Sequence, residues 1–199
     1  MIYATNFLGS FLLTSLLETH LSNCARVIFT SSHGQYGADW QRLFKLPRMA
    51  PNPAFGLKPA DSGFYADTKG MQVAFARLLQ ERFDAVAPEK QCTAHAFSPG
   101  YTFTPIFGKT ADLPWYVDPV FWLLKLATVL ATPVEQGAAT GVWLGITEDQ
   151  KVIGPSRGGE YWDRRKSRRT IVDVLPQGML ERMWELWCVD SGARWHHQK

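Results

Sequence analysis

A tyrosine and a lysine stand four residues apart in the segment GFYADTKGMQVAFARLL, which spans residues 63–79. In a helix this spacing puts Tyr65 and Lys69 one turn apart on the same face. A phenol is a weak acid with a reference pKa of about 10, and a nearby ammonium stabilises the phenolate that forms when the proton leaves. Such a pair can give a proton to a carbonyl oxygen or take one from an alcohol. The same spacing also arises by chance, so the pair does not decide the chemistry alone.

Three further polar residues stand where they can complete such a site. Ser31 and Ser32 end the β-branched run ARVIFTSS, residues 25–32, and parallel α/β sheets bind ligands at the carboxyl ends of their strands. A hydroxyl at that place can donate a hydrogen bond to a substrate oxygen. Asn6, early in an apolar helical pattern, can bind a water that links the lysine to solvent.

The elements that must position these residues alternate along the chain. Strands separated by helices imply a parallel α/β sheet with right-handed crossovers. A Gly- and Pro-containing loop is expected over residues 33–62. Thr132, followed by Pro133 and Glu135, predicts a helix N-terminus with Thr132 as its N-cap. The predicted strands are 25–32, 91–100 and 158–162, and the predicted helices are 6–21, 64–83, 115–130, 132–146 and 179–189.

Composition indicates a single globular domain and excludes several classes of function. Apolar residues make up 46% of the 199 residues, and a net charge of +3 gives no reason to expect nucleic-acid binding. The 3 cysteines lack zinc spacing, so we expect buried free thiols and no metal site. His33 and His95 are expected at a strand end and in the core. The 8 tryptophans predict a core or an apolar pocket in the second half.

Two apolar stretches bear on location. Residues 1–17 carry no charge, but they lack the basic start and the cleavage site of a signal peptide. Residues 115–131 are interrupted by Asp118 and Lys125, which favours an amphipathic helix that can touch a membrane over one that spans it. The basic run at 164–169 is expected to be a solvated loop that can assist such contact. We therefore expect a cytoplasmic chain with peripheral membrane contact.

In combination, these features resemble the short-chain dehydrogenase/reductase family, and its retinol-dehydrogenase-like members in particular. The resemblance implies that residues 1–199 form a single, partial Rossmann-like domain, the C-terminal part of a doubly wound parallel sheet. The glycine-rich turn, the residue that reads the adenosine ribose and the N-N-A-G segment of that family are absent from the sequence. The apolar start is then an internal helix. The segments that carry the resemblance are TNFLGSFLLTSLL, RVIFTSS, YADTK, FSPGYTFTP, TPVEQGAATGVWL and LERMWELW.

The resemblance also assigns roles to residues. It implies that Tyr65 is the catalytic acid/base, that Lys69 assists it and binds the nicotinamide ribose, that Ser32 orients the carbonyl and that Asn6 serves a water relay. It further implies a substrate lid at 101–131 and a disordered tail at 190–199. The implied cofactor is NADP, slightly favoured, or NAD, and its expected contacts are Tyr65, Lys69, Ser31, Pro99, Gly100, Thr102 and Thr104.

Two functions follow as alternatives. The first is an oxidoreductase that interconverts a ketone or aldehyde and an alcohol on an apolar substrate such as a steroid, retinoid, lipid or polyketide. The second is a cofactor-free relative acting as a pseudoenzyme, a dimerisation partner or a non-redox catalyst. A homodimer is expected through the Asn6 and Tyr65 helices, which usually build the dimer interface in this family.

Overall fold

Three parallel strands form the centre of the structure. β1 (Arg26–Thr30) pairs with β2 (Thr93–Ser98), and β2 pairs with β3 (Glu160–Asp163), both in parallel. β4 (Lys166–Arg168) adds to β3 in the antiparallel sense, which gives the order β1-β2-β3-β4. The predicted α/β class and the three predicted strands are confirmed. The computed structural model describes residues 2–44, 59–102, 131–154 and 157–195.

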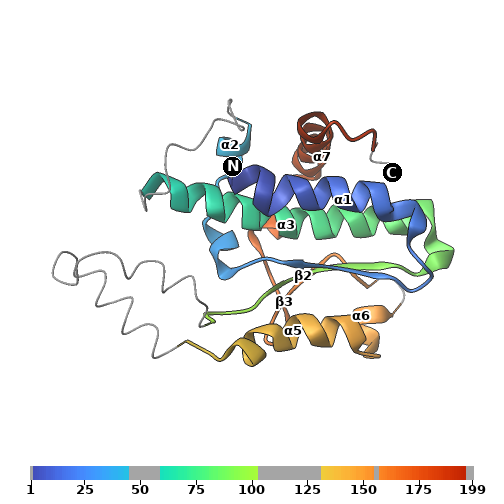
Figure 1. Ribbon diagram of the computed structural model, residues 1–199. Coiled ribbons are helices and arrows are strands. Elements are labelled where there is room, and N and C mark those ends of the chain that lie inside the picture. The colour runs from blue at the N-terminus through green and yellow to red at the C-terminus, as the bar shows by residue number, and fades with distance from the viewer. Residues whose placement is uncertain (1, 45–58, 103–130, 155–156, 196–199) are drawn as a thin grey trace.

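Helices cover both faces of this sheet (Figure 1). α1 (Gly9–Leu17) and α3 (Pro59–Val86) lie on one face, and α5 (Val134–Ile146) and α6 (Gln150–Ile153) lie on the other. α7 (Gln177–Ser191) packs outside α1 and α3. The shorter helices are the π-helix η1 (Ala4–Leu8), the 3-10 helices η2 (Glu18–His20), η3 (His33–Gly37), η4 (Pro88–Lys90) and η6 (Ile171–Val174), and α2 (Trp40–Leu43).

Aromatic rings fill the space between α1, α3 and α7. Phe75 of α3 is fully buried, and its ring centroid lies 5.0 Å from that of Phe11 and 6.1 Å from that of Trp187. Trp184 and Trp195 complete the cluster at 5.8 Å and 5.9 Å from Phe75. The expectation that tryptophans of the second half form a core is confirmed. Buried rings dominate the energetics of such a core, so this cluster fixes α3 against the terminal helices.

The core extends past the residue at which we predicted a disordered tail. That tail was expected over 190–199, but α7 continues to Ser191 and Trp195 is buried. Trp184 Nε1 donates to the carbonyl of Trp195 at 2.6 Å, and Trp195 Nε1 donates to Glu18 at 2.8 Å. Trp195 therefore anchors this segment to the core, and Ala193 packs against the same cluster. Residues 196–199 lie outside the described residues.

Other boundaries also differ from the sequence-based expectations. α3 begins at Pro59, inside the expected loop over 33–62, which also contains η3 and α2. The basic run at 164–169 forms a turn and β4, in which the backbone pairs with β3 and the residues are exposed. Thr132 does not cap α5, since its hydroxyl donates to the carbonyl of Tyr101 at 3.1 Å. The cysteines are free, but Cys24 is exposed.

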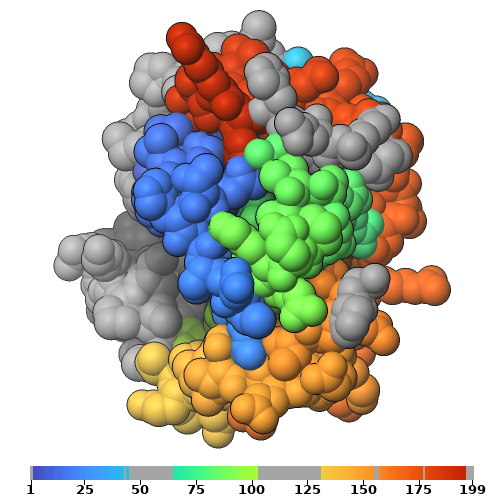
Figure 2. All heavy atoms as spheres, turned by 90° about the vertical axis from the view of Figure 1, so that its right-hand side faces the viewer, coloured from blue at the N-terminus to red at the C-terminus, as the bar shows by residue number. Residues whose placement is uncertain are grey.

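At the amino ends of β1 and β2, hydrogen bonds join the two segments that lead into these strands. The Cys24 amide donates to the Lys90 carbonyl at 2.7 Å, and Lys90 Nζ donates to the Leu21 carbonyl at 3.1 Å. Figure 2 shows this edge, with the segments that lead into β1 and β2 side by side between α7 and α5. The predicted site residues belong to the opposite, carboxyl edge. Within the described part of the chain, no helix is both long and apolar enough to cross a membrane.

A smaller cluster on the α5 side of the sheet contains His95. The imidazole is fully buried; Trp162 Nε1 donates to its Nδ1 at 3.1 Å, and its Nε2 lies 3.2 Å from the Val152 carbonyl. An indole N–H can only donate, so Nδ1 must accept and the ring proton belongs on Nε2. Burial lowers the pKa of His95 to about 4. The expected core histidine is therefore confirmed, and it is neutral.

The neutral His95 makes stability depend on pH. The unfolded chain takes up a proton near the ordinary pKa of 6.5, whereas the folded chain does so only near 4. The unfolded state binds more protons in this window, so we expect the free energy of unfolding to fall by about 3 kcal/mol as pH drops from 6.5 to 4. Urea unfolding at several pH values measures this loss.

His95→Gln separates this effect from other titrations, because an amide can accept from Trp162 and donate to Val152 without titrating. The variant should lose most of the pH slope between 6.5 and 4. His20→Gln, which removes an exposed imidazole, is the control. An unchanged slope in His95→Gln would show that His95 does not carry the effect.

Candidate active site

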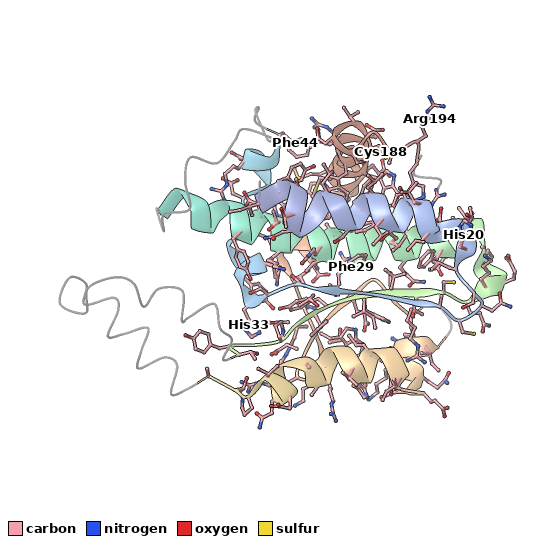
Figure 3. The ribbon with its side chains drawn as sticks, viewed as in Figure 1. His20, Phe29, His33, Phe44, Cys188 and Arg194 are labelled. Atoms are coloured by element: carbon pink, nitrogen blue, oxygen red, sulfur yellow. The ribbon has the colours of Figure 1, made fainter. Side chains whose placement is uncertain are left out.

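Apart from Asn6 and Thr104, the predicted site residues lie at the carboxyl edge of the sheet. Ser31 and Ser32 follow β1, Ser98 ends β2, and the described N-terminal part of α3 carries Tyr65 and Lys69. Figure 3 marks this edge by His33, whereas His20 lies at the opposite end. The placement agrees with the general position of ligand sites in parallel α/β sheets.

Ser31 ties the strand to α3. Its hydroxyl donates to the carbonyl of Lys69 at 2.7 Å, and its amide donates to the Phe97 carbonyl at 2.7 Å. The residue is only 2% exposed. Its hydroxyl therefore holds the backbone of Lys69 next to β1. The predicted cofactor contact of Ser31 stays a prediction.

Ser32 and Tyr65 flank Gly34. The Ser32 hydroxyl accepts from the Gly34 amide at 3.1 Å, which begins η3. A Cβ on Gly34 would lie 3.3 Å from Cε1 of Tyr65 and 3.5 Å from the Ser32 hydroxyl. A glycine at this position therefore lets the phenol ring come close to the serine. From the sequence, Gly34 is expected only as part of the loop over 33–62.

Tyr65 and Lys69 differ in exposure. Tyr65 is 42% exposed, so its ring is open to a ligand at this edge. Lys69 is half-buried, and its Nζ lies 5.6 Å from the centroid of the Tyr65 ring. Burial lowers the pKa of Lys69. The Lys69 ammonium donates to the Thr30 carbonyl at 2.8 Å and to Oε1 of Gln72 at 3.2 Å.

Asn6 reaches this site through its backbone. It lies within the π-helix η1, and its carbonyl accepts from Nε2 of Gln72 at 2.8 Å. Its side-chain amide lies 3.3 Å from the Thr68 hydroxyl, which in turn donates to the Tyr65 carbonyl. Asn6 is thus linked to Lys69 by Gln72, a residue that sequence reasoning missed because it looks like any polar helix position.

Asp67 lies between Tyr65 and Lys69 in sequence but is 1% exposed and forms a separate network. Its carboxylate accepts from Nε and NH2 of Arg42 at 2.6 and 2.9 Å, and from the Asp39 amide at 2.8 Å. The carboxylate raises the pKa of Arg42. These bonds fix the segment before α2 against α3.

The other predicted cofactor contacts follow β2. Gly100 has a φ of 73°, and its amide donates to the Ser98 hydroxyl at 3.0 Å. Thr102 donates to the Pro99 carbonyl at 2.9 Å. The structure thus places Pro99, Gly100 and Thr102 in a tight turn at the carboxyl end of β2. Thr104 and nearly all of the predicted lid at 101–131 lie outside the described residues.

His33 occupies the strand end, as expected. Its side chain is 51% exposed, and its Nε2 lies 3.5 Å from Oδ1 of Asp163, at the carboxyl end of β3. It makes no described contact with Tyr65 or Lys69. The structure therefore brings together Ser32, Tyr65, Lys69 and, through Gln72, Asn6.

Comparison with known proteins finds relatives among the short-chain dehydrogenases/reductases. The chain matches no protein-family model. Human retinol dehydrogenase 14 is 25% identical to it, over 94% of this chain and 50% of that protein. Human polyprenol dehydrogenase is 25% identical over 96% of this chain and 54% of that protein, and human dehydrogenase/reductase SDR family member 13 is 25% identical over 93% and 45%.

The chain is similar to members of the short-chain dehydrogenase/reductase family. It aligns over nearly its whole length with these dehydrogenases, and it spans about half of their length. In the described residues β1 pairs on one side only, with β2. The sequence contains no G-x-G-x-x-G segment. The similarity therefore covers about half of the length of these relatives.

The Asp67 network yields a prediction about how this edge of the sheet is held. Asp67→Ala leaves Arg42 without its bidentate partner and the Asp39 amide without an acceptor. We expect a loss of about 3 kcal/mol in the free energy of unfolding, at the low end for a buried pair because Arg42 is partly exposed. Urea unfolding measures the loss.

Asp84→Ala is the matched control, since Asp84 is an exposed carboxylate on the same helix. It should cost about 1 kcal/mol or less. Equal losses in the two variants would mean that the Asp67 network does not hold this edge.

Proposed function

We propose that this protein is an oxidoreductase that interconverts a ketone or aldehyde and an alcohol on an apolar substrate with NAD(P)(H). The observation that carries the proposal is the exposed Tyr65 ring, which flanks Gly34 together with the Ser32 hydroxyl. The centroid of this ring lies 5.6 Å from the Lys69 ammonium. The names of the relatives, two dehydrogenases of retinol and polyprenol, support the same class of reaction.

The proposed chemistry uses Tyr65 as acid and base. In reduction, the phenol gives its proton to the carbonyl oxygen and the phenolate that remains is stabilised by the Lys69 ammonium. In oxidation, the phenolate takes the proton from the alcohol. The Ser32 hydroxyl can donate a hydrogen bond that orients the substrate oxygen. When bound, a nicotinamide cofactor supplies or accepts the hydride at the carbon.

The residues present fit the nicotinamide end of such a cofactor. An ammonium has three N–H donors, and the described residues provide partners for two of those on Lys69. The third can bind a ribose hydroxyl. The turn at Pro99–Gly100 carries backbone groups at the same edge, with Thr102 next to it. We further propose that Ser31 and Thr104 contact the cofactor and that NADP is slightly favoured over NAD.

We also propose an apolar substrate, peripheral membrane contact and a homodimer. Retinol and polyprenol in the relatives' names are apolar alcohols, which supports an apolar substrate such as a retinoid or another lipid. Peripheral membrane contact by a cytoplasmic chain suits such a substrate. A homodimer through α1 and α3 would have to form beside α7, because α7 packs over both helices.

Tyr65→Phe tests the proposal directly. The variant keeps the ring against Gly34 but loses the proton, so we expect turnover of retinaldehyde with NADPH or NADH to fall by about 10²-fold or more, with cofactor affinity nearly unchanged. Nicotinamide fluorescence measures cofactor binding and turnover, and circular dichroism checks the fold.

Tyr36→Phe is the matched control: Tyr36 is 50% exposed and donates to the Arg169 carbonyl, outside the proposed machinery. It should retain activity. Normal turnover by Tyr65→Phe would remove Tyr65 from the mechanism. A folded wild-type chain that binds neither NADPH nor NADH would overturn the oxidoreductase proposal and favour the cofactor-free alternative.

A further inference from the structure

Gln72 bridges the two residues that the family resemblance connects by water. Its Oε1 accepts from Lys69 Nζ at 3.2 Å, and its Nε2 donates to the Asn6 carbonyl at 2.8 Å. The side chain is buried, at 7% exposure. A continuous chain of protein groups therefore runs from the ammonium to η1.

The partners determine the orientation of the Gln72 amide. A lysine ammonium can only donate, so it must face the amide oxygen, and a backbone carbonyl can only accept, so it must face the amide nitrogen. In the reverse orientation, the amide nitrogen would face the lysine ammonium, which is also a donor, and the amide oxygen would face the Asn6 carbonyl, which is also an acceptor. The bridge is thus specific to a carboxamide that spans both neighbours.

The π-helix supplies one end of the bridge. The Asn6 carbonyl lies within η1, where the backbone departs from regular α-helical hydrogen bonding. Asn6 is held in turn by the Thr68 hydroxyl on α3. The acceptor for Gln72 is therefore itself fixed to the helix that carries Lys69.

We propose that Gln72 is a positioning residue, which holds the Lys69 ammonium beside Tyr65 by tying it to the carbonyl of Asn6. A lysine side chain has a flexible four-carbon stem, so two fixed acceptors, Thr30 O and Gln72 Oε1, define where its charge sits. A carboxamide donates and accepts but does not readily pass a proton on. Its role is therefore to place the ammonium. The catalytic meaning of this role rests on the proposed function.

The test measures the titration of Lys69 itself in the full chain. Trace labelling with acetic anhydride at a series of pH values, followed by mass spectrometry of the peptide that contains Lys69, gives the pKa of this one amine without cofactor or turnover. Gln72→Met removes both hydrogen bonds at similar size, so the pKa of Lys69 should fall by about one unit. Gln72→Glu keeps an oxygen and adds a negative charge, so the pKa should rise by about one unit.

Gln80→Met is the matched control. Gln80 lies on the same helix, is also 7% exposed and also makes several hydrogen bonds, among them one from the Ala94 amide at 2.9 Å. It should lower stability without moving the pKa of Lys69. A Lys69 pKa that is the same in wild type, Gln72→Met and Gln72→Glu would overturn the proposal. If Gln72→Met does not fold by circular dichroism, the expected rise in Gln72→Glu decides alone.

The two proposals fail separately. A chain that turns over no aldehyde but shows the opposite shifts in Gln72→Met and Gln72→Glu would overturn the proposed function and support the positioning role. A chain that reduces retinaldehyde but has the same Lys69 pKa in all variants would support the proposed function and overturn the positioning role. In an active chain, Gln72→Met should lower kcat, because Lys69 stabilises charge in the transition state, and the pH profile of kcat/KM should move with the Lys69 pKa.

Discussion

The packing of Phe75 is the contact on which the rest of the structure depends. Its ring touches aromatic side chains from four other parts of the chain: η1, α1, β1 and the C-terminal segment. All are large apolar groups, so their mutual burial both stabilises the fold and fixes the height and rotation of α3 over the sheet. The rings concerned are Phe7, Phe11, Phe29, Trp184, Trp187 and Trp195, with centroids 4.8 to 6.1 Å from that of Phe75.

Three buried polar side chains also join α3 to neighbouring segments by hydrogen bonds, each to a different one. Ser31 binds the backbone of α3 to the end of β1, Asp67 binds it to the segment before α2, and Gln72 binds it to η1. All three side chains are buried, so these hydrogen bonds are shielded from solvent. Tyr65, by contrast, is exposed to solvent on the same helix. The site is therefore rigid at its base and accessible at the phenol.

Sequence patterns were sufficient for features with a fixed spacing. The tyrosine–lysine interval, the β-branched strand before Ser31 and the alternation of strands and helices all follow from local chemistry, and the structure confirms where they lie. Features that depend on three-dimensional proximity were missed. Gln72 gains its meaning only when η1 lies beside α3, and Gly34 only when the Tyr65 ring approaches it. Trp195 looked like part of a polar tail because its partners, such as Glu18, are far away in sequence.

This dependence on distant segments has a consequence for how the chain folds during synthesis. The Tyr3 hydroxyl donates to Asp190, a contact that spans 187 positions, and the ring of Phe7 in η1 packs on that of Trp187 in α7. Contacts of such long sequence separation form late, because their loop-closure entropy must be overcome first. The helix that bears the tyrosine and lysine is synthesised before α7, so its outer face stays uncovered until Trp184, Trp187 and Trp195 emerge from the ribosome. Until then the nascent chain displays a bare aromatic surface, the kind of surface that molecular chaperones exist to shield.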